Sequence, residues 1–146
     1  MIKTSLHSFA ERIVDARAIT AEDVKLLQRD ILDDGICTRE EGDVLIALDR
    51  VSRASDPSWE AFLVAAVVDF AVWGSRPTGY VDQDAARWVA ASLACGVGPT
   101  DTARRIAFEI VKEAQSVDDA LLAFAMRHPV RRVGAAPRVP SVDLAA

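Results

Sequence analysis

The sequence is poor in the side chains that bind zinc or form disulfides. It has only two cysteines and two histidines among 146 residues. Cys37 and Cys95 form no CxxC motif, and His7 has only Glu11 at helical spacing, a pair that ordinarily lies on a solvated helix face. No signal peptide is recognisable at the start. We therefore expect a cytoplasmic protein with two reduced thiols and no zinc site.

Basic residues are outnumbered by acidic ones. The chain has 17 Lys and Arg against 22 Asp and Glu, and its formal net charge is −5. Nucleic-acid binding requires a basic face that neutralises phosphates, so we expect no nucleic-acid partner. The charge is also uneven, because from Arg127 onward four arginines oppose one acid, Asp143. The C-terminal end therefore carries +3 and the rest of the chain −8.

Long hydrophobic runs are absent. The most apolar stretch, residues 61–73, is 13 residues long and contains Asp69, whereas a membrane span needs roughly 20 apolar residues. We therefore expect no transmembrane segment and interpret this stretch as a core helix buried on most sides. A carboxylate buried there needs a partner, and Arg76 and Arg87 are near in sequence. The alternative for Asp69 is a functional acid in a central groove.

The sequence also lacks the motifs of common enzyme classes. It contains no GxSxG, no phosphate-binding loop and no dinucleotide fingerprint. The glycine-rich segment at residues 96–100, GVGPT, is interpreted as a break between two helices. We therefore predict a non-enzymatic protein.

Strand signals are missing, and helix signals are frequent. No stretch alternates apolar and polar residues between hairpin turns, so we expect no sheet. Helix-capping residues instead precede amphipathic segments at regular intervals. The expected caps are Thr20, Thr38, Asp56, Asp82, Thr100 and Ser116. The expected helices span residues 6–17, 21–32, 39–54, 57–73, 83–94, 101–114 and 117–128.

The spacing of these caps predicts an internal duplication. The first three caps are 18 residues apart, and a shift of 62 residues places them on Asp82, on Thr100 and two residues from Ser116. We therefore predict an all-α fold: a compact bundle of about seven helices, with a duplicated three-helix unit after an N-terminal helix. The helical domain is expected to span residues 1–129. Residues 130–146 contain Gly and Pro without helical periodicity and are expected to form a flexible tail.

The segment at residues 30–41 gathers five acidic side chains around Gly35. An EF-hand frame with this glycine at loop position 6 places oxygen donors at positions 1, 5, 9 and 12, but position 3 is Leu32, which cannot bind a metal. A divalent cation such as calcium or magnesium is one interpretation. Its best ligands are Asp30, Asp34 and Glu41, with Asp33 and Glu40 in reserve.

The other interpretation of this segment is a capped turn between two helices. Asp33 and Asp34 are then solvated, Gly35 supplies a positive φ, and Thr38 with Glu41 caps the next helix. Residues alone leave both interpretations open.

Residues 34–41, DGICTREE, resemble a motif of TerB-like (tellurite-resistance B-like) domains. A looser version occurs at residues 78–85, TGYVDQDA, whereas Cys95 and Gly96 stand where a second Asp-Gly pair is expected. The resemblance implies a compact, duplicated, all-helical fold over about residues 5–128. It also implies a bacterial, stress-associated binding or scaffold module that is not an enzyme.

These observations favour two alternative functions. The first is a bacterial cytoplasmic protein-interaction or scaffold module, and the second is a divalent-cation sensor that uses residues 30–41. Trp59, Trp73 and Trp88 are expected to be core or half-buried packing residues, and one of them is a candidate for lining a partner groove. The C-terminal Leu144, Ala145 and Ala146 resemble a degradation tag recognised by bacterial proteases.

Overall fold

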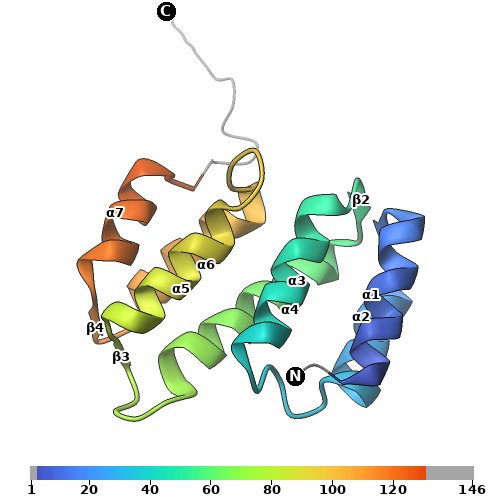
Figure 1. Ribbon diagram of the computed structural model, residues 1–146, viewed down its shortest axis with the longest axis horizontal. Helices are drawn as coiled ribbons and strands as arrows, with labels where there is room; N and C mark the ends of the chain where they lie inside the picture. Colours follow the sequence, from blue (N-terminus) through green and yellow to red (C-terminus); the bar gives the residue numbers. More distant parts are fainter. Residues whose placement is uncertain (1–2, 131–146) are drawn as a thin grey trace, which may run out of the picture.

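The computed structural model describes residues 3–130 of the chain. This part is predominantly helical, and the prediction of an all-α bundle is confirmed. In Figure 1, α1 and α2 lie at one end, α5, α6 and α7 lie at the other, and α3 and α4 lie between them. The helices are α1 (Thr4–Ala16), α2 (Ala21–Leu26), α3 (Arg39–Val51), α4 (Pro57–Val68), α5 (Gln83–Ala94), α6 (Asp101–Glu113) and α7 (Asp119–Arg127).

Two helices continue into π-helical turns at their C-terminal ends. These turns are η1 (Leu27–Ile31), which follows α2, and η2 (Asp69–Trp73), which follows α4. At the end of η1 the N–H of Leu32 donates to the carbonyl of Leu27, five residues earlier, at 2.8 Å. The predicted helices at residues 21–32 and 57–73 are therefore each a single rod with a wider last turn.

Local capping explains where the helices begin. Thr20, Thr38, Asp82 and Thr100 each accept a hydrogen bond from the backbone N–H three residues on, as predicted. The predicted cap at Ser116 is wrong, because Asp118 caps α7 through the N–H of Ala120. Ser116 lies instead in a short strand, whose backbone pairing fixes it two residues before the cap Asp118.

The corrected cap strengthens the prediction of a duplication. Asp56 caps α4 and Asp118 caps α7, which are 62 residues apart, like the pairs Thr20 with Asp82 and Thr38 with Thr100. The helices that follow these caps therefore correspond in order: α2 with α5, α3 with α6, and α4 with α7.

Short parallel strands repeat with the same offset. The strands are β1 (Ala18–Ile19), β2 (Ala54–Ser55), β3 (Tyr80–Val81) and β4 (Ser116–Val117). β1 pairs with β2, and β3 pairs with β4, 62 residues further along. The expectation of no sheet is wrong to this extent. Two-residue strands are too short to produce an alternating pattern in the sequence.

Equivalent backbone hydrogen bonds hold the two pairs of strands. The N–H of Asp56 donates to the carbonyl of Ile19 at 2.8 Å, and the N–H of Asp118 donates to that of Val81 at 2.9 Å. The fold thus consists of two similar units, α2 to α4 and α5 to α7. In each unit, the short strand before the first helix pairs with the short strand before the third.

The helix α4 packs against elements of both units. It contacts α2 and α3 of the first unit and α6 of the second. Trp59, Leu63 and Val67 of α4 are buried in the core. The indole N–H of Trp59 donates to Asp49 of α3 at 3.0 Å, and the hydroxyl of Thr100 donates to the other oxygen of Asp49 at 2.6 Å. One carboxylate therefore joins α3, α4 and the start of α6.

A second contact joins α3 to α5. The N–H of the Trp88 indole donates to Asp43 at 2.9 Å. A Cβ built on Gly42 would lie 3.1 Å from this indole, so the glycine permits the close approach of the ring. Within residues 3–130, no helix is long and apolar enough to cross a membrane.

Candidate functional site

The five acidic residues proposed as metal ligands are spread over three elements. Asp30 lies in η1, Asp33 and Asp34 lie in the turn that follows it, and Glu40 and Glu41 lie in the first turn of α3. The first four are exposed to solvent, whereas Glu41 is only 2% exposed. Of the three best candidate ligands, Glu41 is thus the one that solvent reaches least.

Glu41 is occupied by the backbone of its own loop. Its Oε1 accepts a hydrogen bond from the N–H of Cys37 at 2.7 Å, and its N–H donates to the hydroxyl of Thr38 at 3.2 Å. Gly35 has a φ of +80°. The interpretation of this segment as a capped turn is confirmed in each of these features.

Among the described residues, no group of three or more His, Cys, Asp or Glu side chains is arranged to hold a metal ion. The five candidate ligands are therefore not brought together in this structure. The divalent-cation site stays a prediction.

Asp69 is not the buried acid that the sequence predicts. It is exposed, and it begins η2 at the end of α4. The rest of this helix is buried or partly buried on most sides, as predicted, except along one line that includes Ala61 and Ala65, which are exposed. The reason is that α4 is apolar on all its sides but neighbouring helices cover only some of them.

Ala61, Ala65 and Asp69 follow each other at four-residue intervals, and we name this exposed line the α4 ridge. A groove lies along each side of the ridge, and all three ridge residues line both grooves. The ridge and its two grooves form the candidate functional site, a surface built on one helical rod of residues 57–73.

The first groove lies between the α4 rod and α6 and has a volume of about 680 Å³. Its apolar wall includes Val64, Val68 and Trp73, and its polar side chains are Glu60, Asp69, Arg105, Glu109 and Glu113. Four carboxylates against one guanidinium make this groove acidic.

Ion pairs neutralise only one end of the first groove. Arg105 lies 3.3 Å from Glu60 and 3.8 Å from Glu109, and so bridges α4 and α6. Within residues 3–130, neither Asp69 nor Glu113 has an ion-pair partner. The unneutralised charge therefore lies towards the η2 end, where the side chain of Trp73 is 45% exposed.

The second groove, of about 630 Å³, lies between α4 and the C-terminal end of η1 with the turn that follows it. It is lined by Leu32, Asp33 and Gly35 of the acidic turn and by Phe62 and Ala66 of α4. The turn at residues 33–35 thus contributes to the candidate site as one wall of a groove.

A third pocket, of about 480 Å³, lies beside η2 and the start of α5. It is lined by the aromatic rings of Phe70, Tyr80 and Trp88, and the first and last of these meet edge to face at 5.7 Å. Its carboxylates, Asp82 and Asp118, cap α5 and α7. They therefore have a structural role.

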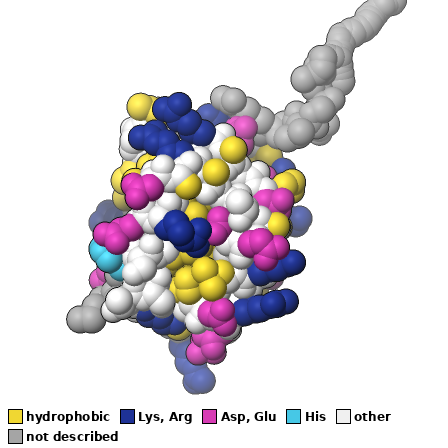
Figure 2. Space-filling model, turned by 90° about the vertical axis from the view of Figure 1, so that its right-hand side faces the viewer, with side chains coloured by type: hydrophobic (Ala, Val, Ile, Leu, Met, Phe, Trp, Pro, Cys, Tyr) yellow, Lys and Arg dark blue, Asp and Glu magenta, His cyan; other side chains and the backbone are white. Residues whose placement is uncertain are grey.

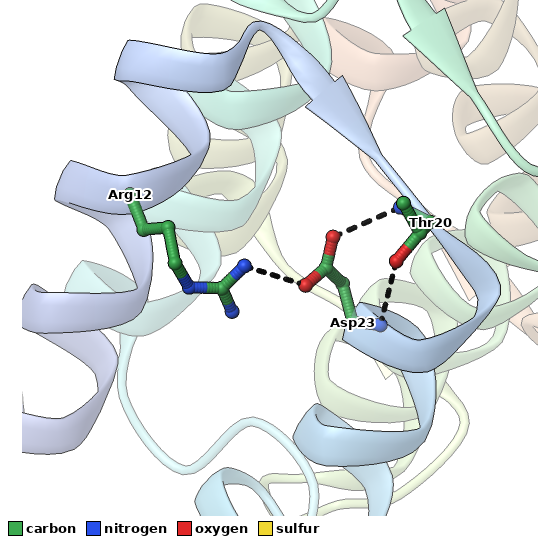
Figure 3. Close-up of polar contacts among 3 residues, drawn as sticks. All are labelled: Arg12, Thr20 and Asp23. Atoms are coloured by element: carbon green, nitrogen blue, oxygen red, sulfur yellow. Dashed lines mark hydrogen bonds and ion pairs between the residues drawn. The ribbon is translucent and has the colours of Figure 1, made fainter.

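At the end of the molecule formed by α1 and α2, the carboxylate of Asp23 is held by hydrogen bonds (Figure 3). It accepts hydrogen bonds from the Arg12 guanidinium at 2.7 Å and from the N–H of Thr20 at 2.9 Å. Burial by itself raises the pKa of Asp23, but these bonds outweigh it, and the pKa lies below its ordinary value. The cluster joins α1 to α2 and lies on neither groove of the α4 ridge.

Figure 2 shows the end of the molecule formed by α1 and α2. Acidic and basic side chains are interspersed there around a small group of hydrophobic ones. Among the described side chains this face therefore has no extended patch of one charge, in contrast to the acidic first groove.

No protein-family model, no curated protein and no solved structure matches this chain. The resemblance to TerB-like domains stays a prediction. The segment that resembles a degradation tag, Leu144 to Ala146, lies outside the described residues, as do residues 131–143 of the predicted tail.

Sequence reasoning missed most of the candidate site. Ala61 and Ala65 are exposed although the sequence predicts a core helix here, whereas Val64 and Val68 pack partly buried against the core. Trp73, at 45% exposed, is half-buried, one of the two placements expected for it. Of the two other tryptophans, Trp59 is buried as predicted, and Trp88 is partly buried against the core. The sequence signal, a segment that is apolar on every side, does not indicate which side its neighbours cover.

Proposed function

We propose that this protein is a non-enzymatic protein-interaction module that binds a helical segment of a partner protein over the α4 ridge. The observation that carries the proposal is the exposed α4 ridge, with two alanines on it and an open, partly apolar groove on each side. Apolar helix faces that neighbouring elements leave uncovered are typical of surfaces that bind another protein.

The dimensions of the ridge favour a helix as the bound segment. Residues 57–73 form a rod about 25 Å long at 1.5 Å per residue. The line from Ala61 through Ala65 to Asp69 has the four-residue spacing of the ridges that interlock when two helices pack. A partner helix of about five turns matches this length, with its apolar side chains in the two grooves.

The ridge is held on a rigid base. The opposite face of the same helix buries Trp59, Leu63 and Val67, and the indole of Trp59 is fixed by Asp49. A surface that is already ordered loses little conformational entropy when it binds, which favours affinity. A binding role thus needs no rearrangement of the core.

The wider setting is part of the same proposal. The TerB-like resemblance favours a bacterial, stress-associated scaffold in the cytoplasm. The net charge of −5 favours a protein partner over a nucleic acid.

In-cell photocrosslinking tests this function. A photoreactive amino acid replaces Ala65 on the ridge, and in a matched control it replaces Ala123, an exposed alanine of α7. We expect light to produce a discrete protein adduct from position 65 and none of the same mass from position 123. Identical adducts from both positions, or none from position 65, would contradict the proposal.

A further inference from the structure

We propose that the segment bound on the α4 ridge is a basic amphipathic helix, with small apolar residues on one face and Lys or Arg along both edges of that face. This inference rests on the proposed function and names the chemistry of its partner. It is carried by the charges that border the two grooves.

The borders of the site are acidic on both sides. The first groove is lined by four carboxylates, Glu60, Asp69, Glu109 and Glu113, and by one cation, Arg105. The second groove adds Asp33 on the other side of the ridge and has no cationic lining residue among those described. A partner helix with acidic edges would meet like charges along both grooves, whereas basic edges meet charges of opposite sign.

The η2 end of the first groove is the best place for a cation. Asp69 and Glu113 line it without an ion-pair partner among residues 3–130, and the exposed indole of Trp73 lies with them. A lysine or arginine there gains two carboxylates and the face of an aromatic ring. Arginine suits this site best, because its flat guanidinium stacks on an indole and pairs with carboxylates.

The other end of the ridge selects for apolar side chains. Ala61 and Ala65 leave little side chain between the α4 backbone and a bound helix. Arg105, the only cation that lines the first groove among residues 3–130, is already paired with Glu60 and Glu109. Leu, Val or Ala of the partner is therefore expected to lie above the alanines, one or two turns from the basic residue at Trp73.

Selection from a helix library tests this inference on the full chain. The probe is a display library of helices of about 18 residues with randomised surface positions, enough to cover the rod of residues 57–73. Selection on the wild-type protein is followed by counter-selection on Ala65→Arg, with Ala123→Arg as the matched control. Ridge-dependent clones are those that lose binding to Ala65→Arg and keep it with Ala123→Arg.

We expect ridge-dependent clones to carry a net positive charge and an Arg or Lys at a fixed distance from their apolar face. Their affinity should fall at least tenfold with Asp69→Lys combined with Glu113→Lys, and it should weaken as salt is raised. Ridge-dependent clones that are neutral or acidic would overturn the inference and leave the proposed function intact.

Other outcomes also decide the matter. If no clone depends on the ridge, both the inference and the proposed function fail. If clones appear only after residues 131–146 are removed, the occupant is the basic C-terminal segment of the chain itself. If the wild-type protein is a dimer and Ala65→Arg is a monomer, the occupant is a second copy. Either of the last two results would overturn the inference that the bound helix belongs to a separate basic partner.

Discussion

Asp23 is a nearly buried carboxylate that stabilises the fold as a charged group. It is 7% exposed, and it completes a capping box with Thr20 while it pairs with Arg12 of the preceding helix. Its pKa is lower in the folded chain than the ordinary value of 3.8, because hydrogen bonds to the carboxylate outweigh the effect of burial.

Asp23→Asn is expected to lower the free energy of unfolding by about 1 kcal/mol at pH 7, because a neutral amide weakens the hydrogen bonds from the Arg12 guanidinium and the Thr20 N–H. Because folding lowers the pKa of Asp23, its stabilising effect is complete above the unfolded value of 3.8 and is lost as the pH falls through the folded value. Urea unfolding of both proteins between pH 7 and pH 2 measures this.

The control for Asp23 is Glu22→Gln, at an exposed neighbour whose nearest cation, Lys25, is 3.9 Å away. We expect this variant to change stability by less than about 0.5 kcal/mol at every pH. A difference between wild type and Asp23→Asn that stays constant down to pH 2 would contradict the assignment.

Arg17 and Gly79 occupy equivalent positions in the two units and share a left-handed backbone. Their φ angles are 55° and 86°. The carbonyl of each accepts a hydrogen bond from the loop that precedes the third capped helix of its unit. The duplicated loop thus requires positive φ in both units, although only the second unit has a glycine there.

Gly79→Ala is therefore expected to lower the free energy of unfolding by about 1–2 kcal/mol, the cost of a left-handed alanine. The new Cβ would lie 3.7 Å or more from its neighbours, so the cost is one of backbone conformation and not of a clash. Chemical denaturation measures it. Arg17→Gly is the matched variant, and we expect a change below about 1 kcal/mol, since the relief of strain opposes the added flexibility. An alanine as stable as the glycine would contradict this account.

At the scale of elements, the loop before α3 depends on the carboxylate of Glu41. Glu41→Ala leaves the N–H of Cys37 without its acceptor, while the Thr38 cap of α3 stays in place. We expect the free energy of unfolding to fall by about 1–2 kcal/mol. Thermal unfolding with and without millimolar Ca²⁺ measures the effect, with Glu40→Ala at the exposed neighbour as control. If Ca²⁺ raises the Tm of wild type but not of Glu41→Ala, the carboxylate serves as a metal ligand and the cation-sensor alternative gains support.

The elements were largely predictable because the signals that start a helix are local. Thr20, Thr38 and Asp82 act within one turn of their own position, so their side chains alone indicate where α2, α3 and α5 begin. The predicted cap at Ser116 is the exception, because Ser116 and Asp118 are both suitable helix caps and lie only two residues apart. The choice between Ser116 and Asp118 is made by the pairing of β4 with a strand that lies far away in the sequence.

The candidate site was much less predictable, because it depends on which side of α4 its neighbours leave uncovered. Ala61 and Leu63 are both apolar, and nothing within the helix distinguishes the exposed one from the buried one. The difference arises from the positions of α2 and α6, which reach α4 from different parts of the chain. Only the assembled fold separates the face of α4 that joins the core from the face that stays exposed.

At the scale of the whole molecule, Asp49 links the two units. Its carboxylate accepts from Trp59, which is 1% exposed, and from Thr100, which caps α6. Asp49→Ala leaves the indole N–H buried without a partner and is expected to lower the free energy of unfolding by about 1–3 kcal/mol. Asp49→Asn keeps an acceptor and should lower it less.

Amide hydrogen exchange shows how far the effect of Asp49→Ala spreads. Because α4 packs against both units, we expect slow amides in α3 and in α6 to lose the same protection. Loss of protection in α3 alone, with α6 unchanged, would show that the two units unfold independently and would contradict the shared role of α4.

The central claim is that the α4 ridge binds a helical segment of a partner protein. Its most direct test is the affinity of the partner identified by crosslinking, measured by titration calorimetry for wild type, Ala65→Arg and Ala123→Arg. Both alanines are exposed on helices, so neither arginine is expected to disturb the fold. We predict that Ala65→Arg weakens binding at least tenfold and that Ala123→Arg leaves it unchanged. Equal affinities for all three proteins would contradict the claim.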